Sequence, residues 1–257
     1  MSLREQSRRA RPGAWITGMR AARQEVKGRV LVFPHAGAGP NALTPLLAAL
    51  PEDHEVFGVT LPGRERRFSE SYERTPDDPQ AVVDGVLTEL RRLPAGRPTV
   101  FFGHSMGVAV AVAVALAEPA LCARLVLSAH PPAGVRYERA DDWDDQVLLD
   151  IIRLGGGTPP EILENPFWRG YVLGLLRSDL SLAGRLVRRN RNGRLTTPLT
   201  VLGGDRDELV DPADLLTWTT RTTATSRTRL FPGGHFYLLD EPNRAAVAAE
   251  ITGRTNG

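Results

Sequence analysis

A serine, an acidic loop and a histidine follow one another in this chain in an order that suits nucleophilic catalysis. Ser105 is the central residue of Gly103-His-Ser-Met-Gly107, which fits the pattern G-x-S-x-G. A serine hydroxyl is a weak nucleophile at neutral pH, so it needs a base beside it and a third group that holds the base in the right tautomer. The elements around Ser105 decide whether the pattern has this chemical meaning.

The segments on either side of Ser105 predict a sharp turn between two buried elements. Residues 99–102, Thr-Val-Phe-Phe, indicate a buried strand, and the Ala/Val-rich residues 109–117, which have no polar face, indicate a buried helix. A serine in such a turn has a strained backbone, and Cβ atoms two residues away would crowd it, which explains Gly103 and Gly107. The helix N-terminus offers free N–H groups to an oxyanion. We therefore predict that Ser105 is a catalytic nucleophile.

His235 is the predicted base. It follows a Gly-Gly pair after the last predicted strand, and the order serine, acid, histidine is that of an α/β-hydrolase. His130 is the second choice, and a surface turn is the alternative role for His235. His130 and His35 both follow predicted strands, so they are also expected to line a substrate pocket. His104 is expected to be packed and His54 to be solvated.

The acid is expected in the loop after residues 199–202. Asp207 is the first choice because it lies three residues past Gly204 in a turn, and Asp205 and Asp211 are the alternatives. Aspartate also favours such loops because its carboxylate bonds to nearby backbone. One of these acids can therefore serve only to hold the loop in shape.

Two backbone N–H groups are the predicted oxyanion donors. One belongs to Met106, the residue after the nucleophile, and the other should come from the loop after the first strand. Ala36 is the first choice in that loop, and Gly37 is the alternative.

The composition of the chain argues against several other classes of protein. The chain has 257 residues, a formal net charge of +2 and 42% hydrophobic residues, which fits one globular domain and argues against a dedicated nucleic-acid binder. Cys122 is the only cysteine, so no intramolecular disulfide and no thiolate metal cluster can form. No apolar run reaches the roughly 18 residues of a membrane span, and the arginine-rich start lacks an apolar signal core. We expect a cytoplasmic protein with no metal site and no membrane segment.

Predicted strands alternate with predicted helices, which indicates a mostly parallel central sheet with helices on both faces. The predicted strands are residues 29–33, 55–60, 99–102, 124–128, 199–202 and 229–231, and the predicted helices are residues 41–50 (capped by Asn41), 76–93, 109–117 and 242–252. Residues 1–28 are polar and are expected to form a loose leader, partly held by Trp15 and Ile16. The prediction is a single domain over residues 1–257.

Residues 135–195 interrupt this alternation and are expected to form a helical lid inserted in the core. The helical segments within them are residues 141–153, 159–164 and 167–188. Gly155-Gly-Gly157 between the first two segments is expected to be a hinge or a helix stop. It is not a phosphate loop, because no Gly-Lys-Ser/Thr follows it.

Six short motifs resemble the type II thioesterases that accompany polyketide synthases and nonribosomal peptide synthetases. They are Leu31-Val-Phe-Pro-His-Ala-Gly37, Leu61-Pro-Gly-Arg64, Gly103-His-Ser-Met-Gly107, Leu154-Gly-Gly-Gly-Thr-Pro159, Leu176-Arg-Ser-Asp179 and Gly233-Gly-His-Phe236. The resemblance runs from about Trp15 to the C-terminus and includes the lid.

The resemblance implies an α/β-hydrolase fold and hydrolysis of acyl groups held on the phosphopantetheine arms of acyl or peptidyl carrier proteins. It implies no cofactor beyond the substrate's own arm, and we expect a monomer. Ser105, Asp207 and His235 match the family's triad positions, and Ala36 and Met106 match its oxyanion donors.

The lid residues expected to line an acyl tunnel, or else to form the lid's own small core, are Trp143, Phe167, Trp168, Tyr171 and Leu175. Some of these lid residues and some residues of the loops after predicted strands are predicted to contact substrate. They are His35, Gly37, His130, Trp168 and Tyr171.

Two charged groups have alternative roles. Arg177 and Asp179 are expected to pair within the lid. Arg64, Arg66 and Arg67 either meet an acidic carrier protein or form a solvated cluster.

Three other functions remain open at this stage. An acyltransferase or an esterase of small oxygen esters would use the same residues on another acceptor or leaving group. A non-catalytic protein that binds acyl carriers is the third, although such a binder has no need to keep serine, acid and histidine in order.

Overall fold

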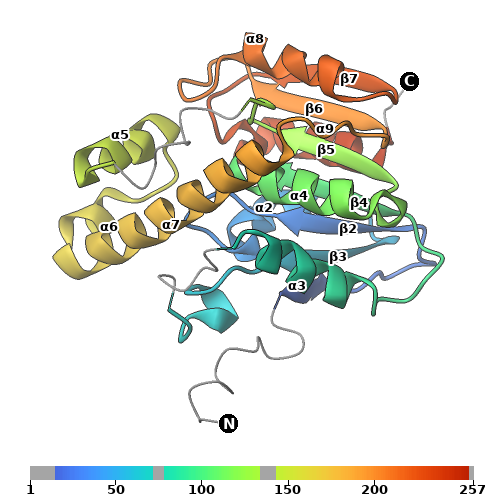
Figure 1. The fold of residues 1–257 in the computed structure, drawn as a ribbon, viewed down its shortest axis with the longest axis horizontal. Coiled ribbons are helices and arrows are strands. Elements are labelled where there is room, and N and C mark those ends of the chain that lie inside the picture. Colours follow the sequence, from blue (N-terminus) through green and yellow to red (C-terminus); the bar gives the residue numbers. More distant parts are fainter. Residues whose placement is uncertain (1–14, 72–77, 134–142, 255–257) are drawn as a thin grey trace.

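The computed structural model describes residues 15–71, 78–133 and 143–254, and these residues form a seven-stranded sheet with helices on both faces (Figure 1). The strands are β1 (Ile16–Arg20), β2 (Gly28–Phe33), β3 (His54–Val59), β4 (Thr99–His104), β5 (Arg124–Ser128), β6 (Leu199–Gly204) and β7 (Ser226–Phe231). Their order is β1-β3-β2-β4-β5-β6-β7, with β1 antiparallel to β3 and the other neighbours parallel. The predicted α/β-hydrolase fold is confirmed.

Each face of the sheet is covered by its own apolar layer. On one face lie α3 (Gln80–Leu90), α4 (Met106–Ala117) and the second half of α7 (Pro166–Asn190), and on the other lie α2 (Thr44–Leu47) and α9 (Glu241–Thr252). Successive side chains of a strand point to opposite faces, so Leu31 and Phe33 join the first layer while Val30 and Val32 join the second. Strands buried on both faces are typical of parallel sheets.

The order of the strands reverses beside β2. The chain continues from β2 to β3 on one side and then to β4 on the other side. In open parallel sheets, ligands bind at the carboxyl ends of the strands where the order reverses. Phe33 pairs with Gly103 and His104 pairs with Ser128, so the loops after β2, β4 and β5 leave the sheet at one level.

The loose leader is shorter than expected. Residues 16–20 form β1, and the Glu89 carboxylate accepts the N–H groups of Trp15 and Ile16 at 3.0 and 2.8 Å. The sequence did not reveal this strand because Gly18 and Arg20 interrupt the alternation of apolar and polar residues. Residues 1–14 lie outside the described residues.

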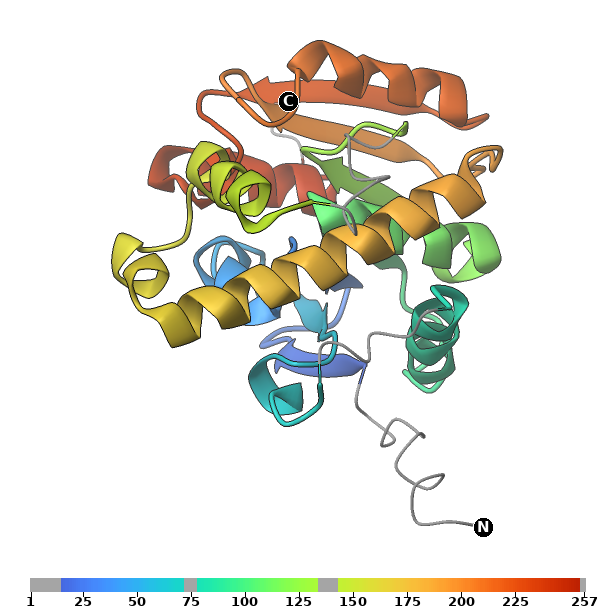
Figure 2. The same ribbon diagram turned by 60° about the vertical axis from the view of Figure 1, so that its left-hand side comes forward.

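The inserted lid consists of α5 (Asp145–Gly155), α6 (Pro160–Glu164) and the first half of α7, and Figure 2 shows α7 running across the molecule. The lid ends earlier than residue 195, because Leu182, Ala183 and Leu186 of α7 belong to the apolar layer over the sheet. Gly155-Gly-Gly157 acts as a helix stop, since α5 ends within it. Residues 134–142, including the start of the predicted 141–153 helix, lie outside the described residues.

Several short elements differ from prediction. Asn41 lies inside the 3₁₀ helix η1 (Pro40–Leu43) instead of capping a helix to Leu50. The predicted helix 76–93 is α3, which is confined to Gln80–Leu90, and residues 76–77 are not described. The elements that the sequence missed are η2 (Glu65–Arg67), η4 (Pro119–Leu121), α8 (Pro212–Leu215), η6 (Leu216–Arg221) and η7 (Tyr237–Leu239). One-turn elements are too short to show a helical period.

Candidate active site

Ser105 lies in a strained turn between β4 and α4. Its φ is 52° and its ψ is −127°, a conformation that L-residues rarely adopt. A Cβ on Gly103 would lie 2.8 Å from Cα of Val108, and a Cβ on Gly107 would lie 2.0 Å from the carbonyl oxygen of Phe33. The two glycines are therefore required by close backbone approach, as the sequence predicts.

Ser105, His235 and Asp207 form a continuous hydrogen-bonded chain. His235 Nε2 lies 2.9 Å from Ser105 Oγ, and His235 Nδ1 lies 2.8 Å from Asp207 Oδ2. The imidazole and its carboxylate partner are held in place, because the side chains of His235 and Asp207 are almost fully buried. With Asp207 accepting a hydrogen bond from Nδ1–H, Nε2 is left to accept the proton of the Ser105 hydroxyl.

The three aspartates of the β6 loop have different partners. The second oxygen of Asp207, Oδ1, accepts the N–H groups of Leu209 and Val210 at 2.9 and 3.1 Å. Asp205 accepts the N–H of Gly233 at 2.9 Å and so ties its loop to the loop that carries His235. Asp211 caps α8. The structure thus brings only Asp207 of the three to the histidine, and Asp207 also holds its own loop through its second oxygen.

Two N–H groups, one at the start of α4 and one in the loop after β2, are the candidate oxyanion donors. Met106 is the first residue of α4, so its N–H has no acceptor within the helix. Ala36 follows β2, and among the described residues its N–H meets no acceptor. Gly37, the alternative donor, already gives its N–H to Asp179 Oδ2 at 2.7 Å. The geometry favours the pair Ala36 and Met106 over a pair that includes Gly37.

Three further imidazoles surround His235 and are held neutral. Burial, followed by the proximity of His235 and His35, holds the pKa of His104 well below its usual range. Burial, with smaller effects of His235 and Arg64, lowers the pKa of His35 to about 3, and burial lowers the pKa of His130 to about 4. None of the three carries charge at neutral pH, so none competes with His235 for a carboxylate partner.

His104 is packed, as the sequence predicts, and it is hydrogen-bonded to a buried serine that in turn bonds to a buried tyrosine. Its Nδ1 lies 2.9 Å from Ser128 Oγ, which lies 2.7 Å from the Tyr237 hydroxyl. Ser128 and Tyr237 were missed by the sequence analysis, although Ser128 ends a buried strand, where a polar side chain indicates a partner. His54 is not solvated as expected: it is buried, with Nδ1 2.7 Å from Asp53.

The aromatic ring of Phe236 lies among these histidines. Its centroid is 4.8 Å from that of His35 and 5.4 Å from that of His235. His35 thus lies at the edge of the site, where the sequence places it. Phe236 was not predicted as a site residue, although it directly follows the base.

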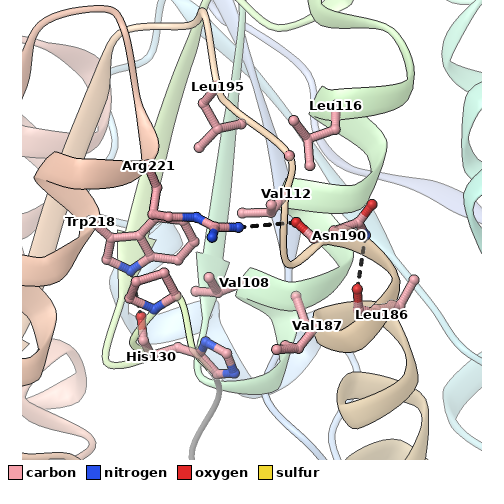
Figure 3. A pocket seen from close by; sticks show the side chains of 13 residues that line it. Val108, Val112, Leu116, His130, Leu186, Val187, Asn190, Leu195, Trp218 and Arg221 are labelled. Carbon is pink, nitrogen blue, oxygen red and sulfur yellow. Dashed lines mark hydrogen bonds between the residues drawn. The ribbon is translucent and has the colours of Figure 1, made fainter.

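His130 lines a hollow on the face of the sheet that α4 covers (Figure 3). The volume of this hollow is about 390 Å³, including its open mouth, and its walls come from α4, the end of α7 and η6. Trp218 Nε1 donates to the His130 carbonyl oxygen at 2.7 Å, and Arg221 donates to the Asn190 carbonyl oxygen at 3.0 Å across it. Neither Trp168 nor Tyr171 lines this hollow.

Trp168 and Tyr171 instead belong to an exposed group of aromatic rings. Phe167 and Trp168 are 69% and 40% exposed, and the ring of Tyr171 lies 5.4 Å from that of Phe68. The Tyr171 hydroxyl donates to the Gly63 carbonyl oxygen.

The other predicted tunnel residues lie deeper in the lid. Leu175 is buried, and Trp143 packs against the lid's apolar cluster, which is the alternative role weighed for it.

The predicted pairing of Arg177 with Asp179 is wrong, and so are the surface roles predicted for Arg64 and Arg67, whereas Arg66 is exposed and its role stays a prediction. Asp179 pairs with Arg64 and not with Arg177, which bonds to the Trp143 carbonyl oxygen and to Asp145. Arg64 is buried and cannot meet a carrier protein. Arg67 is also buried, paired with Glu70. Sequence spacing favoured local partners, whereas the actual partner of Asp179 is 115 residues away.

The described residues contain no group of three or more His, Cys, Asp or Glu side chains placed to hold a metal ion. No helix among them is both long and apolar enough to cross a membrane.

The chain matches a known protein family. Residues 28–254 match the family described as "Thioesterase domain". The chain belongs to the thioesterase domain family. It is 32% identical over 238 residues to a probable cadicidin biosynthesis thioesterase of Streptomyces griseus, and 29% identical over 230 residues to thioesterase TesA of Mycobacterium leprae. These matches cover 86% and 87% of this chain, and 64% and 85% of the two relatives.

A solved member of this thioesterase group has the same fold over its whole length. The type II thioesterase BorB from the borrelidin biosynthetic cluster superposes with a TM-score of 0.77 at 27% identity, covering 96% of this chain and all of BorB. Lid and core therefore both have counterparts in a type II thioesterase.

Proposed function

We propose that this chain is a type II thioesterase that hydrolyses acyl thioesters from the phosphopantetheine arm of carrier proteins in a polyketide or nonribosomal peptide pathway. The observation that carries the proposal is the chain of hydrogen bonds from Ser105 Oγ to His235 and from His235 to Asp207. The similarity to a cadicidin biosynthesis thioesterase and to BorB supports the class of pathway.

Acylation begins with attack of Ser105 Oγ on the thioester carbonyl carbon. His235 Nε2 takes the hydroxyl proton as the new C–O bond forms, and Asp207 stabilises the imidazolium. The carbonyl oxygen becomes an oxyanion, which accepts hydrogen bonds from the N–H groups of Ala36 and Met106. When the tetrahedral intermediate collapses, the C–S bond breaks, and the thiol leaves with the proton from His235.

Deacylation repeats these steps with water as the nucleophile. His235 removes a proton from water, the hydroxide attacks the Ser105 ester, and His235 returns the proton to Ser105 Oγ as the free acid leaves. These steps use only the chain's own residues, so we propose that no bound cofactor takes part. We also propose that the enzyme is a cytoplasmic monomer, and light scattering of the purified chain checks the monomer.

The experiment compares two donors of one acyl group. An acyl-loaded carrier protein and the same acyl group on coenzyme A are incubated with the enzyme, and intact-mass spectrometry follows loss of the acyl mass. Parallel reactions contain an alcohol or an amine acceptor, and a simple oxygen ester is tested beside them.

The proposal predicts that the carrier loses its acyl group faster than coenzyme A does, with the free acid as product. Equal or faster loss from coenzyme A would indicate a general acyl thioesterase. Transfer to the added acceptor would indicate an acyltransferase, and preference for the oxygen ester would indicate an esterase. If the carrier, coenzyme A and the oxygen ester all keep their acyl groups, the result would indicate a non-catalytic protein that binds acyl carriers.

A further inference from the structure

A buried ion pair joins the lid to the loop that carries Ala36. Asp179 of α7 is fully buried, and its two carboxylate oxygens accept hydrogen bonds from Arg64 Nη1 and Nη2 at 2.5 and 2.7 Å. Asp179 Oδ2 also accepts the N–H of Gly37 at 2.7 Å. One lid carboxylate therefore holds both a buried guanidinium and the backbone next to the proposed oxyanion donor.

Arg64 also binds the loop that carries Ala36 directly, because its Nη1 donates to the Ala38 carbonyl oxygen at 3.2 Å. Its Nε donates to the carbonyl oxygen of Pro62, in the loop of Arg64 itself, at 3.3 Å. Residues 37 and 38 are thus held from one side by Asp179 and from the other by Arg64. The methyl group of Ala36 packs against the lid's apolar cluster, so the residue before them also touches the lid.

The Ala36 N–H lies in the peptide plane between residues 35 and 36, and the next plane, which carries the Gly37 N–H, is joined to it through the Cα of Ala36. Ala36 lies directly before Gly37, whose φ of +78° belongs to the left-handed region. An unheld peptide next to a glycine in this conformation has other backbone conformations within reach. Oxyanion stabilisation depends on donors that are fixed before the charge develops.

We propose that Asp179, held by Arg64, is a positioning residue that fixes the Ala36 N–H for the oxyanion and thereby makes the catalytic site depend on the seating of lid helix α7. The inference rests on the proposed function. In this proposal Asp179 touches no substrate atom and acts through Gly37. Because the Gly37 N–H already donates to Asp179, Ala36 is left as the oxyanion donor of this loop.

A purely structural role of the ion pair predicts something different. Removing one partner of a buried pair leaves an uncompensated charge and destabilises the fold, whereas an apolar replacement of both partners is often tolerated. If the pair only stabilised the fold, replacing both partners would restore stability and activity together. If Asp179 positions the loop, stability returns but the acceptor for Gly37 is still absent.

The test uses full-length variants Asp179→Ala, Arg64→Lys and the double variant Arg64→Met/Asp179→Leu, because an asparagine at 179 would keep an oxygen that accepts the Gly37 N–H. Asp145→Ala is the matched control, because it removes another ion pair of the lid, with Arg177. Each protein is measured for thermal unfolding, for kcat and KM on an acyl thioester, and for the rate at which a fluorophosphonate labels Ser105. The fluorophosphonate places a phosphoryl oxygen where the oxyanion forms, so it reports the donors without any thioester.

We expect Asp179→Ala and the double variant to lower kcat and the labelling rate by about 10- to 100-fold, which is less than the loss of a whole oxyanion donor. KM should change little, the double variant should unfold near the wild-type temperature, and Asp145→Ala should resemble wild type. Arg64→Lys keeps the charge and loses the two-pronged bond, so a reduced rate there supports the proposal even if Asp179→Ala does not fold.

Wild-type rates in the folded Asp179 variants would overturn the proposal, as would recovery of both stability and activity in the double variant. These outcomes leave the proposed function intact if Ser105→Ala is inactive. A Ser105→Ala protein that still hydrolyses thioesters, or a wild-type Ser105 that is not labelled, would overturn the proposed function and this inference with it.

Discussion

The three aspartates of the β6 loop look alike in the sequence, but their partners in the structure distinguish them. Asp205, Asp207 and Asp211 all follow one strand, and each fits a turn that aspartate favours. Only Asp207 lies against His235, while Asp205 holds Gly233 and Asp211 caps α8. The sequence placed an acid in the right loop, but its choice among the three depended on spacing alone, because side-chain direction in a loop has no periodic signal.

Asp207→Asn should lower kcat by about 10³- to 10⁴-fold, because an amide can donate to Nδ1 and stabilise the wrong tautomer of His235. Asp205→Asn is the matched control. Its amide oxygen still accepts from Gly233, so we expect less than about a 10-fold loss. Thiol release from an acyl thioester measures both variants, and equal losses in the two would contradict the assignment.

Whole elements were predicted best where both faces are buried. The strand before Ser105 and the helix after it are apolar without interruption, and both form as expected. β1 was missed because Gly18 and Arg20 break its pattern, although Glu89 and β3 hold it in place. The end of the lid was misjudged because α7 is one helix that serves two layers, and a sequence pattern shows no boundary inside a continuous helix.

The packing of α4 against β2 gives a prediction for the element. Gly107→Ala should lower the free energy of unfolding by at least about 1–3 kcal/mol, because its Cβ would lie 2.0 Å from the Phe33 carbonyl oxygen and must displace backbone. Gly170→Ala in α7 is the control. Nothing lies within 4 Å of the Cβ that alanine would add there, so the free energy of unfolding should rise by about 0.5–1 kcal/mol. Urea unfolding checks both, and an unchanged Gly107→Ala protein would contradict the elbow geometry.

Across the whole molecule, the shared direction of the six parallel strands β2 to β7 brings the loops after them to one edge of the sheet. The alternation of strands and helices was sufficient to predict this edge and the residues on it. It was not sufficient to predict the tie between Asp179 and Arg64, because ion pairs between distant segments leave no local pattern. A charged residue on the otherwise apolar face of a predicted helix is the signal that could have indicated it.

The buried histidines make the stability of the whole molecule depend on pH. The pKa of His130 is about 4 in the folded chain and 6.5 ordinarily, with burial as the main cause. Between these values the unfolded chain binds a proton that the folded chain does not, so the free energy of unfolding falls as pH falls through this window. The contribution of His130 is about 3 kcal/mol. His35 acts in the same direction.

His130→Asn should therefore flatten the decline of unfolding free energy between pH 6.5 and pH 4. Urea unfolding at a series of pH values measures the slope for the variant and the wild type. Identical slopes would show that His130 titrates normally in the folded chain.

The proposed mechanism requires that thioester hydrolysis pass through an acyl group on Ser105. Rapid quenching of the wild-type enzyme with an acyl thioester, followed by peptide mass mapping, detects this intermediate. We expect transient acyl mass on the peptide that contains Ser105, and a fall in turnover of at least about 10³-fold in Ser105→Ala. Full turnover by Ser105→Ala, or acyl mass on another residue of a competent intermediate, would rule the mechanism out.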